Sequence, residues 1–397
     1  MPGESPLSMM RQPARRSREP SAGNARRRRW PILAPVAVVV VAALAWALLW
    51  YYAAYVADRT LAGWVEREAA AGRVYSCGAQ SIGGFPFSID ARCTDAAAKI
   101  TNLQLPYALK AKAISFAANV WRPTLLAGDI SGPVTLAETG RPPSWTADWA
   151  HARLSVRGVP PDPDALSVEF VQAHIDRAGA GAVLNIKGAD LQSRLLAGSP
   201  RHNPVIGTTL HVVGMAASAL HPLLAQPLDI ELDAVLHGLK DLSPKPWAQR
   251  FREMQAGNGS FEIKSLHVVQ NDVVVVGSGT LSLNANGRLD GVMRVTIAGI
   301  EHLVPLLGID RLLGDGLDKL AGSPGATAQG ISAIDRLVPG LSGALRESAS
   351  ASLGANLKKM GEPSSIGNQP AVVLPLRFAD GAVYLGMLRV GEVPALF

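Results

Sequence analysis

The amino-acid sequence predicts a mainly β protein of the α+β class, in which one N-terminal transmembrane helix precedes an elongated antiparallel meander sheet with short covering helices. Three observations predict it: a long uncharged run near the N-terminus, two hairpin-like segments in which apolar and polar residues alternate, and a stretch between them with leucine and valine at helical spacing. Of the 397 residues, 48% are hydrophobic and 18% are charged, which excludes an intrinsically disordered chain and a polytopic membrane protein.

The first element is the uncharged run, which extends from Trp30 to Ala57. About 20 such residues cross the hydrocarbon core of a bilayer. The four arginines at 26–29 keep the N-terminus in the cytoplasm by the positive-inside rule. We therefore expect a basic cytoplasmic tail over 1–30, a transmembrane helix over 31–57, and the rest of the chain across the membrane. A cleaved signal peptide is the alternative, but its apolar core of about 7–15 residues would be shorter than this run.

The formal net charge of +6 belongs to the tail. Residues 1–30 hold eight arginines, two glutamates and no lysine, and the other 367 residues hold 30 basic and 30 acidic side chains. A neutral body creates no general positive field, so we expect no nucleic-acid partner.

Cys77 and Cys93 are the only cysteines, and both follow the predicted transmembrane helix. If the segment between them folds as a hairpin about Phe85, the two cysteines face each other on neighbouring strands, near disulfide range. The residues that supply the turn are Gly83, Gly84 and Pro86. We expect a structural disulfide, which suits an oxidising compartment. A redox pair or two metal-ligand thiols are the alternatives, but the sequence has no C-x-x-C motif and no cysteine–histidine cluster.

After the anchor we expect a helical stalk over 58–74 and a β-rich body over 75–397, with a helical insert at about 300–360. In the insert, leucine and valine recur every three or four residues, which predicts short amphipathic helices that cover a face or an end of the sheet. A mobile lid or a membrane-surface helix is the alternative.

The first of the two hairpins lies before the insert, where apolar residues fall on odd positions from 281 to 297. A three-residue loop with Asn286 at its centre and Gly287 in the left-handed conformation pairs Leu283 with Leu289 and keeps one apolar face.

The second hairpin follows the insert and turns at Asp380 and Gly381. Here the apolar residues fall on even positions, so we expect Phe378 and Tyr384 to share a face. The two segments resemble each other and are interpreted as two copies of one hairpin unit. They predict a sheet of meandering hairpins with one apolar face.

No catalytic or metal-binding pattern is present in the sequence. It has no P-loop, no G-x-S-x-G, no H-E-x-x-H and no G-x-G-x-x-G, and its eight histidines lack metal-ligand spacing. We therefore expect a noncatalytic protein without catalytic residues, cofactor or metal site.

Three sequence features carry a resemblance to a known family: the N-terminal anchor, the segment GGFPFSIDARC at 83–93 preceded by Cys77-Gly78, and the ending LPLRFADGAVYLGMLRVGEVP at 374–394. On these the chain resembles the alphaproteobacterial domain of unknown function 2125 family. The resemblance implies a periplasmic body tethered to the bacterial inner membrane, and it brings no established activity. The β-rich part is also similar to the AsmA-like group of envelope proteins.

These features together predict noncatalytic association with lipid or other hydrophobic envelope components, through an apolar groove of the sheet. An ordinary closed core is the alternative explanation of the apolar face. Two other functions stay open: a periplasmic scaffold for an envelope protein complex that has no lipid ligand, and an enzyme whose site is assembled from dispersed residues.

Overall fold

The computed structural model describes residues 30–101, 106–159, 162–220, 222–243, 245–302, 361–386 and 388–397. The chain forms two units, Met1–Tyr55 and Val56–Phe397. The predicted tail lies outside the described residues except for Trp30, and the predicted helical insert lies outside them from residue 303 onward.

Helix α1 (Trp30–Ala70) is continuous and passes from the first unit into the second. Its stretch Ala34–Ala70 is long and apolar enough to cross a membrane, and its valines and leucines are exposed instead of packed in a protein core. The segments predicted separately as membrane helix and stalk are therefore one helix. It stops at Ala70, before the stalk's expected end, and Arg73 already belongs to the first strand.

After α1, the described part of the second unit is mainly one antiparallel sheet of eighteen strands, which confirms the predicted fold class. The strands before residue 200 are β1 (Arg73–Ser76), β2 (Ala79–Gly83), β3 (Ser88–Ile100), β4 (Tyr107–Asn119), β5 (Arg122–Glu138), β6 (Trp145–Asp148), β7 (His151–Val159), β8 (Asp162–Arg177) and β9 (Gly181–Ser199). The strands after it are β10 (His202–Met215), β11 (Leu228–Leu236), β12 (Ser260–Gln270), β13 (Val273–Leu283), β14 (Leu289–Ala298), β15 (Glu362–Ile366), β16 (Gln369–Ala379), β17 (Ala382–Leu385) and β18 (Leu388–Glu392). A 3-10 turn, η1 (Pro222–Leu224), precedes β11, and helix α2 (Trp247–Ala256) packs against β13.

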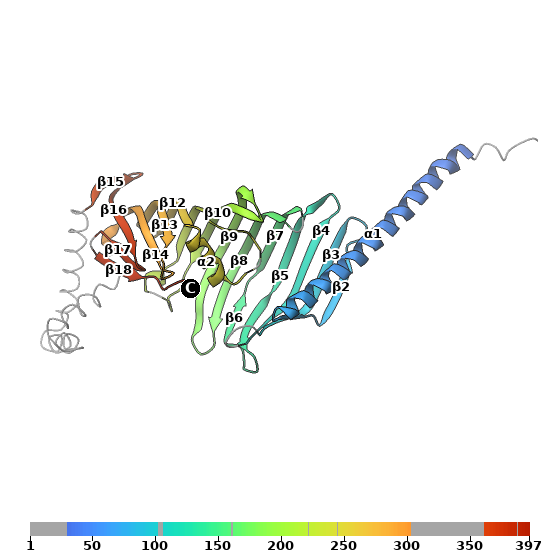
Figure 1. The fold of residues 1–397 in the computed structure, drawn as a ribbon, viewed down its shortest axis with the longest axis horizontal. Coiled ribbons are helices and arrows are strands. Elements are labelled where there is room, and N and C mark those ends of the chain that lie inside the picture. The colour runs from blue at the N-terminus through green and yellow to red at the C-terminus, as the bar shows by residue number, and fades with distance from the viewer. Residues whose placement is uncertain are drawn as a thin grey trace, which may run out of the picture. The chain divides into compact units, whose positions relative to one another are not determined.

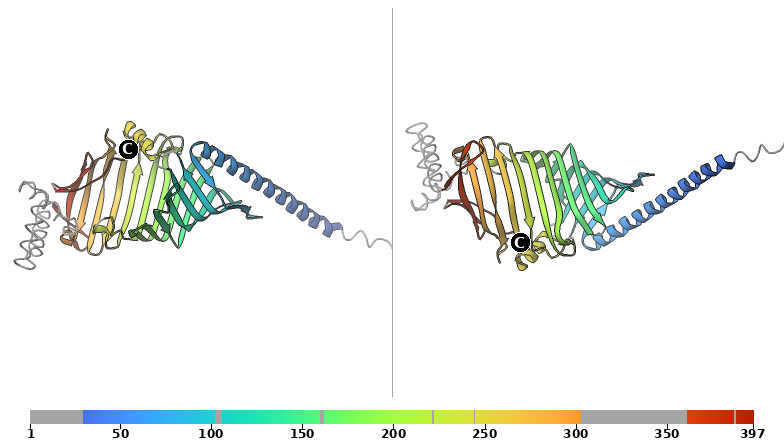
Figure 2. Two further views of the ribbon diagram at one scale, coloured as in Figure 1. Left: turned by 90° about the horizontal axis from the view of Figure 1, so that it is seen from below. Right: turned by 90° about the horizontal axis from the view of Figure 1, so that it is seen from above.

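Apart from β15, the strands follow one another along the sheet in chain order, as the colour gradient in Figures 1 and 2 shows. Strand β15 precedes β16 in the chain but pairs with the edge of β16 that faces away from β14. In three places two short strands share one edge of a longer strand. Strands β1 and β2 both pair with β3, β6 and β7 both lie between β5 and β8, and β15 and β17 both pair with β16. All these pairings are antiparallel, which is the predicted meander.

The strand registers place eleven apolar residues and two glycines, with no polar residue among them, in one continuous row across thirteen strands, from β2 to β16. We call it the apolar row; each member faces the next, in the order Ile82, Ala91, Phe116, Gly128, Leu154, Val168, Leu191, Leu210, Leu232, Leu266, Gly277, Val295 and Leu374. Because successive side chains of a strand point to opposite faces, the neighbours of these residues lie on the other face.

That other face is polar over the same strands. The adjacent row, which we call the polar row, contains Ser81, Arg92, Ser115, Asp129, Arg153, Glu169, Asp190, His211, Glu231 and His267. The sheet is thus amphipathic from β2 to β12.

The hairpin between β13 and β14 has the predicted register. Leu283 faces Leu289, and Gly287 has a φ of +70°. The Asn284 amide donates to the Arg288 carbonyl at 2.9 Å, which leaves the three-residue loop expected from the sequence.

The hairpin between β16 and β17 differs from the prediction. Ala379 pairs with Ala382, so the turn is the two-residue Asp380–Gly381, with both φ angles positive. A two-residue turn pairs even with odd positions, and Phe378 therefore faces Val383. Tyr384 lies opposite Arg377, whose guanidinium carbon is 5.2 Å from the tyrosine ring centroid. The expected shared face of Phe378 and Tyr384 is wrong, and the two hairpins use different loops.

Candidate functional site

The candidate site is the apolar face of the sheet, defined as the apolar row and the two rows that flank it on the same face. One flanking row consists of Ile89, Ala118, Leu126, Val156, Leu166, Ser193, Thr208, Ala234 and Ile263. The other contains Cys93, Ile114, Ile130, Phe170, Ala189, Val212, Ile230, Val268, Val275, Ile297 and Val372. The only hydroxyl groups in these rows belong to Ser193 and Thr208, and their oxygen atoms form a hydrogen bond of 3.0 Å with each other.

Burial changes along the apolar face. At the β13–β16 end its side chains form a closed core in which Leu374 is 1% exposed and Val295 is 3% exposed. In the middle strands the residues of the apolar row are only partly buried. In the flanking row beside them, Leu126 is 41% exposed and Leu166 is 38% exposed. The same face is thus a core at one end and a partly accessible apolar surface across the middle.

The polar face carries two hollows, of about 520 Å³ and about 360 Å³. The larger is lined by polar side chains such as Ser167, Gln192 and Thr209, together with aliphatic side chains that include Leu125 and Val235. Along the polar row, the Glu231 carboxylate lies 4.0 Å from His211 and 3.8 Å from His267, and each contact is an ion pair only when the histidine is protonated. Such exposed pairs stabilise a fold little. Among the described residues, no group of three or more histidine, cysteine or acidic side chains is arranged to hold a metal ion.

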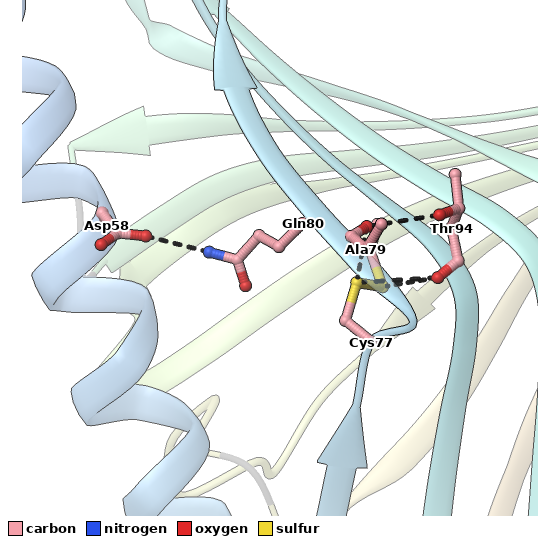
Figure 3. The surroundings of a disulfide bond; sticks show 6 residues. Asp58, Cys77, Ala79, Gln80 and Thr94 are labelled. Carbon is pink, nitrogen blue, oxygen red and sulfur yellow. Dashed lines mark hydrogen bonds between the residues drawn. A yellow bond between two sulfur atoms is a disulfide. The ribbon is translucent and has the colours of Figure 1, made fainter.

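Cys77 and Cys93 form a disulfide, with a Cα–Cα distance of 5.6 Å (Figure 3). The predicted hairpin register is wrong, however, because Gln80 faces Cys93 and Ala79 faces Thr94. Cys77 lies in the link between β1 and β2, where the Gly78 amide donates to the Thr94 carbonyl at 2.9 Å. The bond therefore runs diagonally from this link to β3, and not straight across a ladder.

The register shifted because the turn is not centred on Phe85. Strand β2 ends at Gly83 and β3 begins at Ser88, so four residues form the loop. Gly84 has a φ of +97°, and the amides of Phe87 and Ser88 both donate to its carbonyl. Pro86 lies inside the loop, as predicted, while Gly83 is part of the strand.

Residues 50–394 match the model of the family described as "Uncharacterized protein conserved in bacteria (DUF2125)". The chain belongs to this family. The match covers the end of α1, the disulfide and the entire described sheet, and it confirms the resemblance seen in the sequence. No curated protein and no solved structure matches the chain, so its likeness to AsmA-like proteins stays a prediction.

The two predicted turns of this DUF2125 protein, Asn286–Gly287 between β13 and β14 and Asp380–Gly381 between β16 and β17, lie side by side. The side-chain amides of Asn284 and Asn286 donate to the Asp380 carboxylate at 3.0 and 3.4 Å, and Arg288 donates to the Asp380 carbonyl at 3.1 Å. The Gly381 amide donates to the Leu289 carbonyl at 3.2 Å. These hydrogen bonds, above all the one from Asn284, lower the pKa of Asp380 from its ordinary value. The cluster joins two hairpins and is structural.

The continuity of the apolar face is not apparent from the sequence. Strands β7 to β10 alternate visibly, as in Leu154 and Val156 or Leu191 and Leu195. A sequence shows the alternation of each strand but not the register between strands, and only the register places Leu191 opposite Leu210. Trp121, an exposed residue of the β4–β5 turn, was also missed because a single aromatic residue forms no pattern.

Proposed function

We propose that this protein is a noncatalytic, single-pass inner-membrane protein whose periplasmic sheet associates with lipid through its apolar face. Helix α1 would be the anchor. The four arginines before it favour a cytoplasmic N-terminus. The Cys77–Cys93 disulfide supports an oxidising compartment for the sheet.

The observation that carries the proposal is the unbroken apolar row. At about 4.8 Å between neighbouring strands, thirteen strands give an apolar band of roughly 58 Å. One leaflet of a bilayer core is about 15 Å thick, so the band exceeds the length of an acyl chain. Apolar surface that is left in water costs about 25 cal/mol per Å², and an acyl chain on the partly exposed middle of the band would remove that cost.

Photo-crosslinking in living cells tests this association. A photoreactive phenylalanine analogue replaces Leu191, on the apolar face, or Gln192, the next residue and on the polar face. Both positions lie at the centre of β9, so the two variants differ mainly in the face that carries the probe. The proposal predicts a lipid adduct, measured by mass spectrometry of the full-length protein, at position 191 and none at position 192.

Two results would contradict the proposal. Equal lipid adducts at both positions would mean nonspecific contact with membrane. A protein adduct at position 191 without lipid would favour the alternative function, a periplasmic scaffold for an envelope complex.

A further inference from the structure

Three large aromatic side chains are exposed at one end of the sheet. Phe85 and Phe87, in the β2–β3 loop, are 53% and 54% exposed, and Trp121, in the β4–β5 turn, is 73% exposed. We call these three residues the aromatic tip. Exposed apolar side chains that gather in one place indicate contact with another apolar surface.

The aromatic tip is built jointly by two hairpins. The Val120 amide donates to the Phe87 carbonyl at 3.0 Å, which ties the two loops together. The rings of Phe87 and Trp121 stack, with centroids 6.2 Å apart and planes at 29°. The Trp121 amide is held by the Asn119 side chain at 2.8 Å. Contacts between the two loops thus hold the side chains of Phe87 and Trp121 together.

Within the second unit, the end of α1 runs antiparallel to β1 and β2. Three successive contacts show this direction: Glu68 pairs with Arg73, Trp64 stacks on Tyr75 at 4.9 Å, and the Gln80 amide donates to the Asp58 carboxylate at 3.0 Å (Figure 3). Each step toward the start of the helix is thus a step toward the end of β2.

The direction of β2 carries the aromatic tip beyond Asp58. Asp58 is the first charged residue after the apolar run of α1. Strand β2 continues past its contact with Asp58, and at about 3.3 Å per residue the loop begins roughly 13 Å beyond Gln80. Within the second unit, the tip therefore lies beyond Asp58 in the direction of the helix's N-terminal end.

We propose that the aromatic tip inserts into the interface of the bilayer that α1 spans, and so gives the sheet a second membrane contact. This inference depends on the anchor in the proposed function, but not on lipid binding by the apolar face. Aromatic rings, tryptophan above all, favour the boundary between headgroups and acyl chains. Arg122, exposed and directly after Trp121, adds a positive charge that suits lipid phosphates.

The chain provides a matched control for Trp121. Trp247, in α2, is 71% exposed and stacks on Phe251, with centroids 6.0 Å apart and planes at 30°. Its surroundings resemble those of Trp121, but α2 packs against β13, far along the sheet from β4 and β5.

Bromolipid quenching of tryptophan emission tests the inference. Full-length wild type, Trp121→Phe and Trp247→Phe are reconstituted in nanodiscs of phospholipid with or without bromine on the acyl chains near the headgroup. Subtracting each variant from wild type gives the emission of the replaced tryptophan. We expect bromine to cause a loss of the Trp121 emission and to leave the Trp247 emission unchanged.

Other outcomes of this experiment are distinguishable. Equal quenching of both tryptophans, or of neither in protein that has entered the nanodiscs, overturns the inference. Failure to enter nanodiscs contradicts the anchor itself, and the inference fails with it. If Trp121 is shielded both from bromolipid and from an aqueous quencher, a protein surface covers the tip, and the membrane contact is wrong.

Discussion

Cys77 is disulfide-bonded to Cys93, although the residue that faces Cys93 in the β2–β3 ladder is Gln80. The bond connects the link after β1 to the middle of β3. It fixes the two short strands that lie next to the end of α1.

Loss of this bond should destabilise the fold. The two cysteines are 16 residues apart, and in the chain-entropy model a crosslink over a loop of this size contributes about 3 kcal/mol. We expect the double variant Cys77→Ser, Cys93→Ser to lose a free energy of unfolding of this order, measured by chemical denaturation of the full-length protein. An unchanged denaturation midpoint would show that the strands hold the link without the crosslink.

The last residue of β2, Gly83, and the first residue of the β2–β3 loop, Gly84, should respond differently to an added methyl group. A Cβ at Gly84, whose φ is +97°, would lie 2.5 Å from the Ser88 hydroxyl and 2.7 Å from the Ser88 carbonyl oxygen. A Cβ at Gly83 meets nothing within 4 Å. We expect Gly84→Ala to destabilise the protein by more than about 1 kcal/mol and Gly83→Ala to cost less. Similar denaturation midpoints for the two variants would contradict the loop geometry.

Leucines of the apolar row should differ in what they contribute to stability. Leu374, 1% exposed in the closed core, should lose about 3 to 4 kcal/mol as Leu374→Ala. Leu232, only partly buried in the middle of the row, should lose about half of that or less as Leu232→Ala. Chemical denaturation of lipid-free protein measures both. An equal loss at both positions would show that the middle of the sheet is as closed as its end.

Asp380 should make the stability of the sheet end depend on pH. The side-chain amides of Asn284 and Asn286 lower its pKa below the ordinary value of 3.8. Folding therefore favours the charged carboxylate, so the contribution is fully present above the unfolded pKa and is lost as the pH falls through the lower, folded one. Asp380→Asn, which tolerates the positive φ at this position, should flatten the fall in denaturation midpoint between about pH 5 and about pH 3. An unchanged pH profile would contradict the prediction.

Local patterns in the sequence predicted much of the fold. The apolar run predicted α1, and strict alternation together with Gly287 predicted the pairing of Leu283 with Leu289. The Asp380 turn failed because alternation does not reveal loop length, and a loop shorter by one residue moves Tyr384 to the other face. The cysteine register failed for the same reason, since Gly84 opens a four-residue loop that is not centred on Phe85.

The candidate site was predicted only as one apolar face of a sheet. Its length depends on twelve registers between neighbouring strands, and each register depends on loop lengths and β-bulges that the alternation of a single strand does not reveal. The aromatic tip could not be predicted from the sequence for a similar reason. Phe87 and Trp121 meet because β2–β3 and β4–β5 are neighbouring hairpins, and nothing in either loop's sequence indicates the other.

The lipid content of the sheet unit tests the central claim most directly. Full-length protein carrying an engineered protease site directly after the apolar run of α1, at Asp58, is folded in membranes and cleaved, and the released sheet unit is analysed by native mass spectrometry without detergent. The matched variants are Leu191→Gln with Leu210→Gln on the apolar face, and Asp190→Asn with His211→Gln on the polar face. We predict a bound lipid mass in wild type and the polar-face variant, and its loss in the apolar-face variant. A bare protein mass in all three, with no binding of added phospholipid, would contradict lipid association.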